Sequence, residues 1–172
     1  AYLAEKLESF GFSVRRGLGG TGVLGELKGA APGPVVGLRA DMDALGHEID
    51  GQLVAIHSCG HDAHSTMVLA AAEALAKKGI ARGTLKILFQ PAEELLFGAR
   101  RMIADGAADD LDMLFGIHLR PGQEAKSGQA TPALHHGASW VAKAHIEGRT
   151  AHGARPHLGI NAIHAASSII QA

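Results

Sequence analysis

The sequence predicts an α/β protein with a largely parallel central sheet and helices on both faces of that sheet. Short apolar runs alternate with helical patterns along most of the chain, as in sheets whose parallel strands are joined by helices. Acidic residues or a histidine follow three of these runs directly. The 172 residues, 47% of them hydrophobic and 19% charged, suit a globular domain with a sizeable core.

In the first half of the chain, helices are expected where apolar residues recur at helical spacing and strands where short apolar runs occur. Gly11 and Gly79 are placed to end the helices expected over 2–10 and 64–78. The glycine-rich run 17–22 is expected to be a loop, because a strand-like run rather than a helix follows it. The expected elements are a helix over 2–10, strands starting near 12 and over 23–27 and 35–39, a loop over 44–58, and a helix over 64–78.

The second half continues the alternation and then changes character near Gly137, where a second domain is expected to begin. The expected elements are a strand over 84–89, a helix over 94–104, strands over 111–117 and 139–147, a polar loop over 148–159 and a helix to 172. The chain opens and closes within helical patterns, so we expect it to be part of a longer protein.

Charge and composition argue against several classes of partner. The net charge is −1, which creates no field that attracts nucleic acid or an acidic membrane. No apolar run approaches the roughly 20 residues of a membrane span, and no secretion signal opens the chain. The single cysteine cannot form an internal disulfide. We therefore expect a cytoplasmic protein without nucleic-acid or membrane partners.

Cys59 and His61 form the first candidate metal-ligand pair. A thiolate and an imidazole two residues apart can hold one ion or two neighbouring ions, and Gly60 removes side-chain bulk between them. Zinc accepts such mixed sulfur and nitrogen ligands. Considered alone, the pair is better explained as a buried apolar cysteine beside a surface histidine.

Glu93 and Glu94 are adjacent carboxylates that leave a strand in different directions. One can bind a metal ion while the other takes a proton from water that the metal activates. The simpler alternative is an acidic helix start, which the helix dipole favours.

Asp41, Asp43 and His118 also follow apolar runs. The two aspartates can lie on one side of an extended segment, as metal ligands, as supports for histidine ligands, or in a solvated turn. A lone histidine such as His118 is most often structural. Ligands bind at the carboxyl ends of strands in open α/β sheets, so we expect all these groups at one edge.

Five segments, taken together and in this order, resemble the amidohydrolase branch of the aminoacylase and carboxypeptidase-like metallopeptidases. This branch includes hippurate hydrolases, N-acyl-amino-acid deacetylases and hydrolases of indole-acetyl amino acids. The resemblance implies a phosphorylase/hydrolase-like core of the two-metal exopeptidase type. Residues 1–136 would be part of its metal-binding catalytic domain, and 137–172 the beginning of a smaller α+β lid or dimerisation domain. The segments are Gly37–Leu45, His57–His64, Phe89–Glu94, Gly116–His118 and Ala151–Ile163.

The resemblance also implies roles for individual residues in the catalytic domain. Two divalent metal ions are expected, zinc or manganese first, with cobalt or nickel as alternatives. Glu93 matches the general base, which later protonates the leaving amine. The residues that match metal ligands are Cys59, His61, Glu94 and His118.

Asp41 and Asp43 match an acidic pair for which we favour a supporting role. In the lid, His152 matches a histidine that reaches a partner's active site across a homodimer and stabilises the oxyanion. Arg155 and Asn161 are candidates for contacts with the substrate.

The expected function is metal-dependent hydrolysis of the amide bond of an N-acyl amino acid or a similar small amide. One alternative is a dipeptidase or N-carbamoyl amino acid hydrolase with the same chemistry. Another is an inactive fragment or metal-binding module, because the family supplies a further histidine ligand that this chain lacks. Relatives generally have proline after the segment matching Ala44-Leu45, where this chain continues with Gly46-His47-Glu48, so substrate preference is not carried over.

Overall fold

The computed structural model describes residues 1–133 and 141–171, and the chain divides into two compact units, Ala1–Gln129 and Ala130–Ala172. Each unit is described by itself. The boundary predicted between residues 136 and 137 lies outside the described residues, so the division into catalytic and lid domains stays a prediction. No helix within the described ranges has the length and apolar character needed to cross a lipid bilayer.

The first unit contains a five-stranded sheet with the strand order β1-β2-β6-β3-β7. Strands β6, β3 and β7 are parallel, whereas β1 pairs with β2 and β2 with β6 in antiparallel fashion. The α/β class is confirmed, and the sheet is mixed because β2 is antiparallel to both of its neighbours, to one of which, β1, a short glycine turn joins it. The elements of this sheet and its helices are α1 (Tyr2–Ser9), β1 (Ser13–Leu18), β2 (Gly22–Lys28), β3 (Ala31–Asp41), α2 (His61–Lys78), β6 (Arg82–Gln90), α3 (Gly98–Ala104) and β7 (Met113–Gly116).

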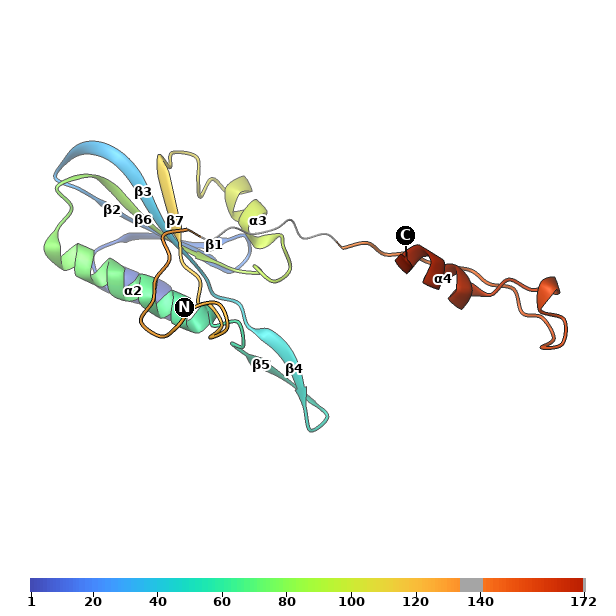
Figure 1. The fold of residues 1–172 in the computed structure, drawn as a ribbon. Helices are drawn as coiled ribbons and strands as arrows, with labels where there is room; N and C mark the ends of the chain where they lie inside the picture. Colours follow the sequence, from blue (N-terminus) through green and yellow to red (C-terminus); the bar gives the residue numbers. More distant parts are fainter. Residues whose placement is uncertain (134–140, 172) are drawn as a thin grey trace. The chain divides into compact units, whose positions relative to one another are not determined.

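Helices cover both faces of the sheet, as the sequence predicts (Figure 1). Successive strand residues point to opposite faces, and β6 shows this alternation clearly. Ile87 and Phe89 are fully buried in the cluster that packs with α1 and α2, whereas Leu88 packs with Met102 of α3. Burying each such side chain stabilises the fold by about 1.5–3 kcal/mol. Strand β6 therefore contributes buried side chains to the hydrophobic cores on both faces of the sheet.

The carboxyl ends of the three parallel strands lie at one edge of the sheet. Asp41, the last residue of β3, is in register with Gln90, the last residue of β6, and β7 ends at Gly116 beside them. Helix α2 begins at the same edge, where the Ser65 hydroxyl donates a hydrogen bond to the Asp41 carbonyl oxygen at 2.9 Å. The functional groups predicted at strand ends therefore share this edge.

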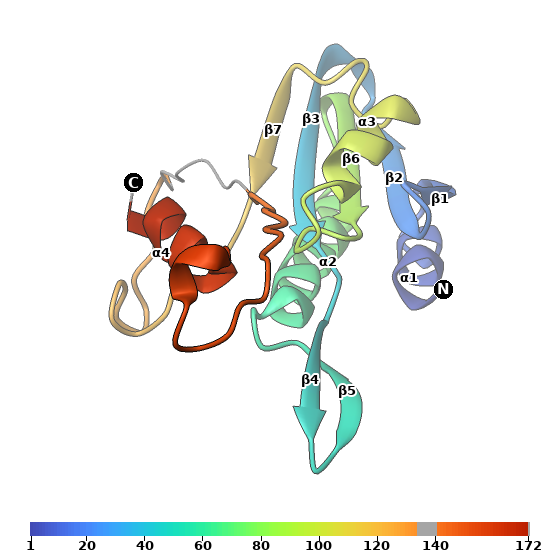
Figure 2. The same cartoon turned by 90° about the vertical axis from the view of Figure 1, so that its right-hand side faces the viewer.

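The prediction of a loop over residues 44–58 is wrong. The segment forms a hairpin of β4 (Leu45–Ile49) and β5 (Gln52–Ile56) that extends away from the five-stranded sheet (Figures 1 and 2). Asp50 and Gly51 form its turn with φ values of 51° and 75°. Asp-Gly is a preferred pair for such tight turns, and it was the sequence signal for this hairpin.

The strand predicted over 139–147 is wrong for residues 141–147, which pair with no strand in the described part of the chain. Residues 139 and 140 lie outside the described residues. A strand needs a neighbour to satisfy its backbone N–H and C=O groups. In the second unit, Arg149 and Ile160 instead form an isolated bridge around η1 (Pro156–Leu158), and α4 (Ala162–Gln171) follows.

The start of α2 depends on Gly60. Its φ is 81°, and its carbonyl oxygen accepts the His64 N–H at 3.0 Å. A Cβ atom at this position would lie 2.8 Å from Cδ1 of Leu119. The left-handed backbone therefore favours glycine, and any larger residue would also have to displace the Leu119 side chain.

We predict that Gly60→Ala destabilises the protein more than Gly11→Ala, measured as the free energy of urea-induced unfolding. Gly11 also has a positive φ, 92°, but a Cβ there would meet nothing within 4 Å. The Gly11 variant should therefore lose only the backbone cost of about 1–2 kcal/mol, whereas Gly60→Ala must also displace Leu119. Equal losses in the two variants would show that the Leu119 contact does not constrain α2.

Candidate metal centre

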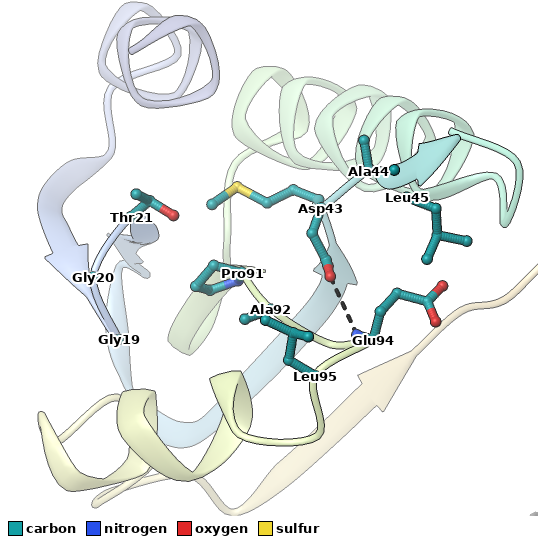
Figure 3. A pocket seen from close by; sticks show the side chains of 12 residues that line it. Gly19, Gly20, Thr21, Asp43, Ala44, Leu45, Pro91, Ala92, Glu94 and Leu95 are labelled. Atoms are coloured by element: carbon teal, nitrogen blue, oxygen red, sulfur yellow. Dashed lines mark hydrogen bonds between the residues drawn. The ribbon is translucent and has the colours of Figure 1, made fainter. Parts of the chain in front are cut away.

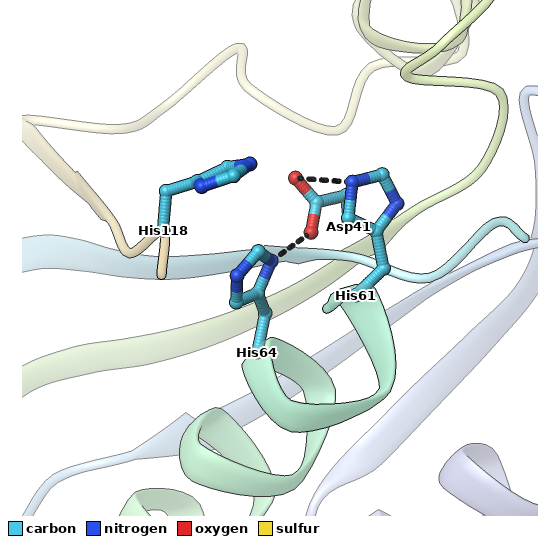
Figure 4. Close-up of side chains that lie close together, drawn as sticks. All are labelled: Asp41, His61, His64 and His118. Atoms are coloured by element: carbon cyan, nitrogen blue, oxygen red, sulfur yellow. Dashed lines mark hydrogen bonds and ion pairs between the residues drawn. The ribbon is translucent and has the colours of Figure 1, made fainter. Parts of the chain in front are cut away.

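The imidazole of His61 is buried among carboxylates at the sheet edge. Its side chain is 1% exposed, and it is the first residue of α2. Carboxylate oxygens lie 3.8, 3.3, 3.8 and 3.7 Å from a ring nitrogen of His61, and they belong respectively to Asp41, Asp43, Glu93 and Glu94. Figure 4 shows the part of this cluster that Asp41 and the histidines form.

Negative charge dominates around His61. Arg39 Nη1 lies 2.8 Å from Asp41 Oδ2, and no other lysine or arginine within residues 1–133 or 141–171 forms an ion pair with the four carboxylates. Carboxylates gathered in a partly buried site repel one another. A divalent cation would offset that repulsion.

Four polar side-chain atoms in the described part of the chain are buried without a hydrogen bond, and all four belong to this cluster. They are both ring nitrogens of His61, Oδ1 of Asp43 and Oε1 of Glu94. Buried polar atoms are normally paired, and each exception calls for an explanation such as an ion. Because carboxylate oxygen and imidazole nitrogen are metal-ligand atoms, these atoms fit a cation.

The four predicted metal ligands are brought together. Ligand atoms of Cys59, His61 and Glu94 all lie within 4.8 Å of one another, and Cys59 Sγ lies 3.5 Å from His118 Nε2. Nδ1 of His118 lies 2.6 Å from the carbonyl oxygen of Leu119, which can only accept a hydrogen bond. The proton of the neutral ring is therefore on Nδ1, and Nε2 presents its lone pair toward Cys59, as in metal-ligating histidines.

Burial raises the pKa of the Cys59 thiol to about 11, and a hydrogen bond and negative charge from Glu94 add to this effect. The thiol is therefore protonated at neutral pH in the metal-free chain. Metal ions bind the thiolate, so binding must release this proton.

Asp41 acts on the cluster through His64, a residue to which the sequence assigned no role. Burial alone would raise the pKa of Asp41, but the hydrogen bond from His64 and the charge of Arg39 lower it overall. His64 Nε2 accepts the Leu119 N–H at 2.8 Å, so Nδ1 carries the proton and donates to Asp41 Oδ1 at 2.6 Å. His64 thus ties β3 to the segment that carries His118. His64 follows His61 by three residues, which places both on one helix face. This spacing was the sequence feature that could have indicated a role for His64.

Glu93 and Glu94 lie on a turn, because α3 starts at Gly98 rather than at residue 94 as predicted. The explanation of this pair as an acidic helix start is therefore wrong. Ala92 and Leu96 flank the pair with φ values of 50° and 58°, an uncommon conformation for such residues. The turn directs both carboxylates to the cluster, and Glu93 remains 34% exposed.

Asp43 supports this turn as well as facing His61. Its Oδ2 accepts the backbone N–H of Glu94 at 3.2 Å, while Oδ1 faces Nδ1 of His61 at 3.3 Å. One carboxylate thus contacts two of the predicted ligands, and the supporting role of Asp43 stays a prediction.

His152, Arg155 and Asn161 all lie in the second unit, and their roles remain predictions. Nδ1 of His152 accepts the N–H of Ala154 at 3.2 Å. Asn161 Oδ1 accepts the N–H groups of residues 163 and 164, so this side chain caps α4.

Comparisons with known proteins identify relatives of this chain. The hippurate hydrolase of Campylobacter jejuni is 38% identical over 179 residues, covering 99% of this chain and 46% of the relative. The N-acetyl-L-cysteine deacetylase of Bacillus subtilis is 36% identical over 184 residues, covering 100% and 43% respectively. A solved dinuclear metal-binding peptidase of the M20 family from Bacillus subtilis superposes with a TM-score of 0.63 and 32% identity, over 70% of this chain and 36% of that chain.

The chain thus spans less than half the length of these relatives. The model that describes peptidase family M20/M25/M40 matches residues 37–169. The predicted resemblance is therefore confirmed, and the chain belongs to the peptidase family M20/M25/M40.

Proposed function

We propose that this chain supplies the main part of a two-metal active site that hydrolyses the amide bond of N-acyl amino acids. The observation that carries the proposal is the set of buried, unpaired ligand atoms around His61. The residues that would hold the ions are Cys59, His61, Glu94 and His118. The thiol favours zinc, with manganese, cobalt or nickel as alternatives that metal availability decides.

Divalent ions, when bound, would polarise the amide carbonyl and make nearby water more acidic. Glu93 suits the transfer of protons, because it reaches the cluster within 3.8 Å of His61 while staying partly exposed. Its carboxylate takes a proton as the water oxygen bonds to the carbonyl carbon. It returns that proton to the nitrogen as the C–N bond breaks, which releases a carboxylate and an amine.

Three residues of the second unit are candidates for contacts with the substrate. We propose that His152, from the other subunit of a homodimer, stabilises the negative charge on the former carbonyl oxygen. Arg155 and the amide nitrogen of Asn161 are candidates for binding the substrate carboxylate.

Dipeptide hydrolysis is the second candidate, favoured by the likeness to a structure described as a peptidase. A substrate panel that compares N-acyl, carbamoyl and aminoacyl derivatives of one amino acid separates these activities. The rival without catalysis would bind metal and turn over none of them.

We predict that Glu93→Gln lowers kcat about 100- to 10,000-fold, the usual contribution of a general base, in protein expressed from the complete reading frame. Metal content, measured by mass spectrometry, should remain that of the wild type. The adjacent Glu94→Gln is the matched variant and should lose bound metal. Near wild-type hydrolysis by Glu93→Gln would exclude it as the base.

We predict that zinc affinity rises about tenfold per pH unit between pH 7 and 8.5, because zinc must displace one proton from Cys59. The pKa near 11 keeps this thiol protonated throughout that range, so the rise should not level off. Competition with a chelator of known pH dependence measures it. Cys59→Ser should bind weakly and with little pH dependence, and a flat profile in the wild type would contradict the ligand assignment.

A further inference from the structure

His64 is a buried histidine of α2 whose two ring nitrogens are both engaged. Its side chain is 0% exposed, and Figure 4 shows it beside Asp41 and His118. Nδ1 donates a hydrogen bond to Asp41 Oδ1 at 2.6 Å, and Nε2 accepts the N–H of Leu119 at 2.8 Å. A neutral imidazole has one donor and one acceptor nitrogen, so His64 has no lone pair left for a metal ion. The possible ligand set that combines it with Asp41 and two further histidines would have to break these hydrogen bonds.

The segment that carries His118 follows the end of β7 and has little backbone support of its own. Residues 118–120 lie outside every helix and strand, and no backbone-to-backbone hydrogen bond within the described part of the chain involves them. Backbone groups in such a segment need partners among side chains or solvent. The position of this segment therefore depends on the side chains that contact it.

Two hydrogen bonds at Leu119 connect His64 to the imidazole of His118. The N–H of Leu119 donates to His64 Nε2, and the carbonyl oxygen of Leu119 accepts the Nδ1–H of His118 at 2.6 Å. The rings of His64 and His118 also lie against each other, with centroids 4.4 Å apart. Nε2 of His118 then faces Cys59 Sγ at 3.5 Å. This continuous set of hydrogen bonds, which starts at Asp41, fixes the direction in which His118 presents its lone pair.

We propose that His64 is a positioning residue that acts through the backbone of Leu119 to hold His118 in the orientation that binds metal. His64 is not itself a ligand. This inference rests on the metal-binding part of the proposed function and adds a residue that the predicted ligand set lacks. Removing a group that orients a metal ligand typically lowers metal affinity about 10- to 100-fold.

Two substitutions separate the two hydrogen bonds of His64. The side-chain amide of His64→Gln places its oxygen as many bonds from Cβ as Nε2, so it can still accept the Leu119 N–H. The amide of His64→Asn corresponds to Nδ1 instead and can reach only Asp41. In protein expressed from the complete reading frame, His64→Asn should lower zinc affinity about 10- to 100-fold, whereas His64→Gln should stay close to the wild type. Competition with a chelator measures both.

His118→Ala supplies the reference for this comparison. Because His64 acts through His118, adding His64→Asn to His118→Ala should lower zinc affinity no further. Two independent ligands would instead give losses that add. The double variant therefore distinguishes a positioning residue from a further ligand.

A measurement on the metal-free wild type does not depend on the folding of any variant. The ring nitrogen chemical shifts of His64 should show a proton on Nδ1 and none on Nε2, and the N–H of Leu119 should be protected from hydrogen exchange. In His64→Asn this N–H should exchange faster, and in His64→Gln it should remain protected.

The possible outcomes separate this inference from the proposed function. Unchanged zinc affinity in His64→Asn, an equal or larger loss in His64→Gln, or additive losses with His118→Ala would overturn the positioning role. A proton on Nε2 of His64 in the wild type would do the same. Each of these results is compatible with the proposed function. A wild type that binds no zinc would overturn the proposed function, and the role of His64 with it.

Discussion

The structure of the sheet edge depends on one buried imidazole held among four carboxylates. Both ring nitrogens of His61 are buried and have no hydrogen-bond partner within residues 1–133 and 141–171, and such unpaired groups each cost about 1–3 kcal/mol. The fold tolerates this cost because the strand ends, α2 and the turn after β6 all fix their side chains around the same point. A cation bound by these unpaired atoms, as proposed, would offset this cost and would couple folding to metal binding at this site.

The rest of the first unit explains how these groups are held. The parallel pairing of β3 with β6 brings Asp41 beside the start of the turn that carries Glu93 and Glu94. His64 links Asp41 to the backbone of Leu119, and Gly60 lets that same segment approach the start of α2. The metal-ligand candidates therefore come from separate parts of the sequence, but a continuous set of backbone pairings and hydrogen bonds positions them.

Sequence patterns predicted the parts of this fold that local chemistry determines. The polar residues that follow the apolar runs of β3, β6 and β7 indicated the edge of the sheet where the candidate site lies. The ordered motifs indicated the ligand candidates Cys59, His61, Glu94 and His118. The β4–β5 hairpin was missed because its strands are mostly exposed and lack a buried apolar run. The cavity that Asp43 and Glu94 line was not predicted for another reason: its wall combines two turns and the connection from β3 to β4, which only the folded chain brings together (Figure 3).

The most direct measurement is the free energy of unfolding of the protein, expressed from its complete reading frame, with and without zinc. If the buried atoms around His61 form a metal site, zinc at 100 times its dissociation constant should stabilise the wild type by about 2.7 kcal/mol. His61→Asn should lose most of this gain. A wild type whose stability does not respond to zinc, manganese or cobalt, or a variant that responds equally, would contradict the assignment of a metal centre to this cluster.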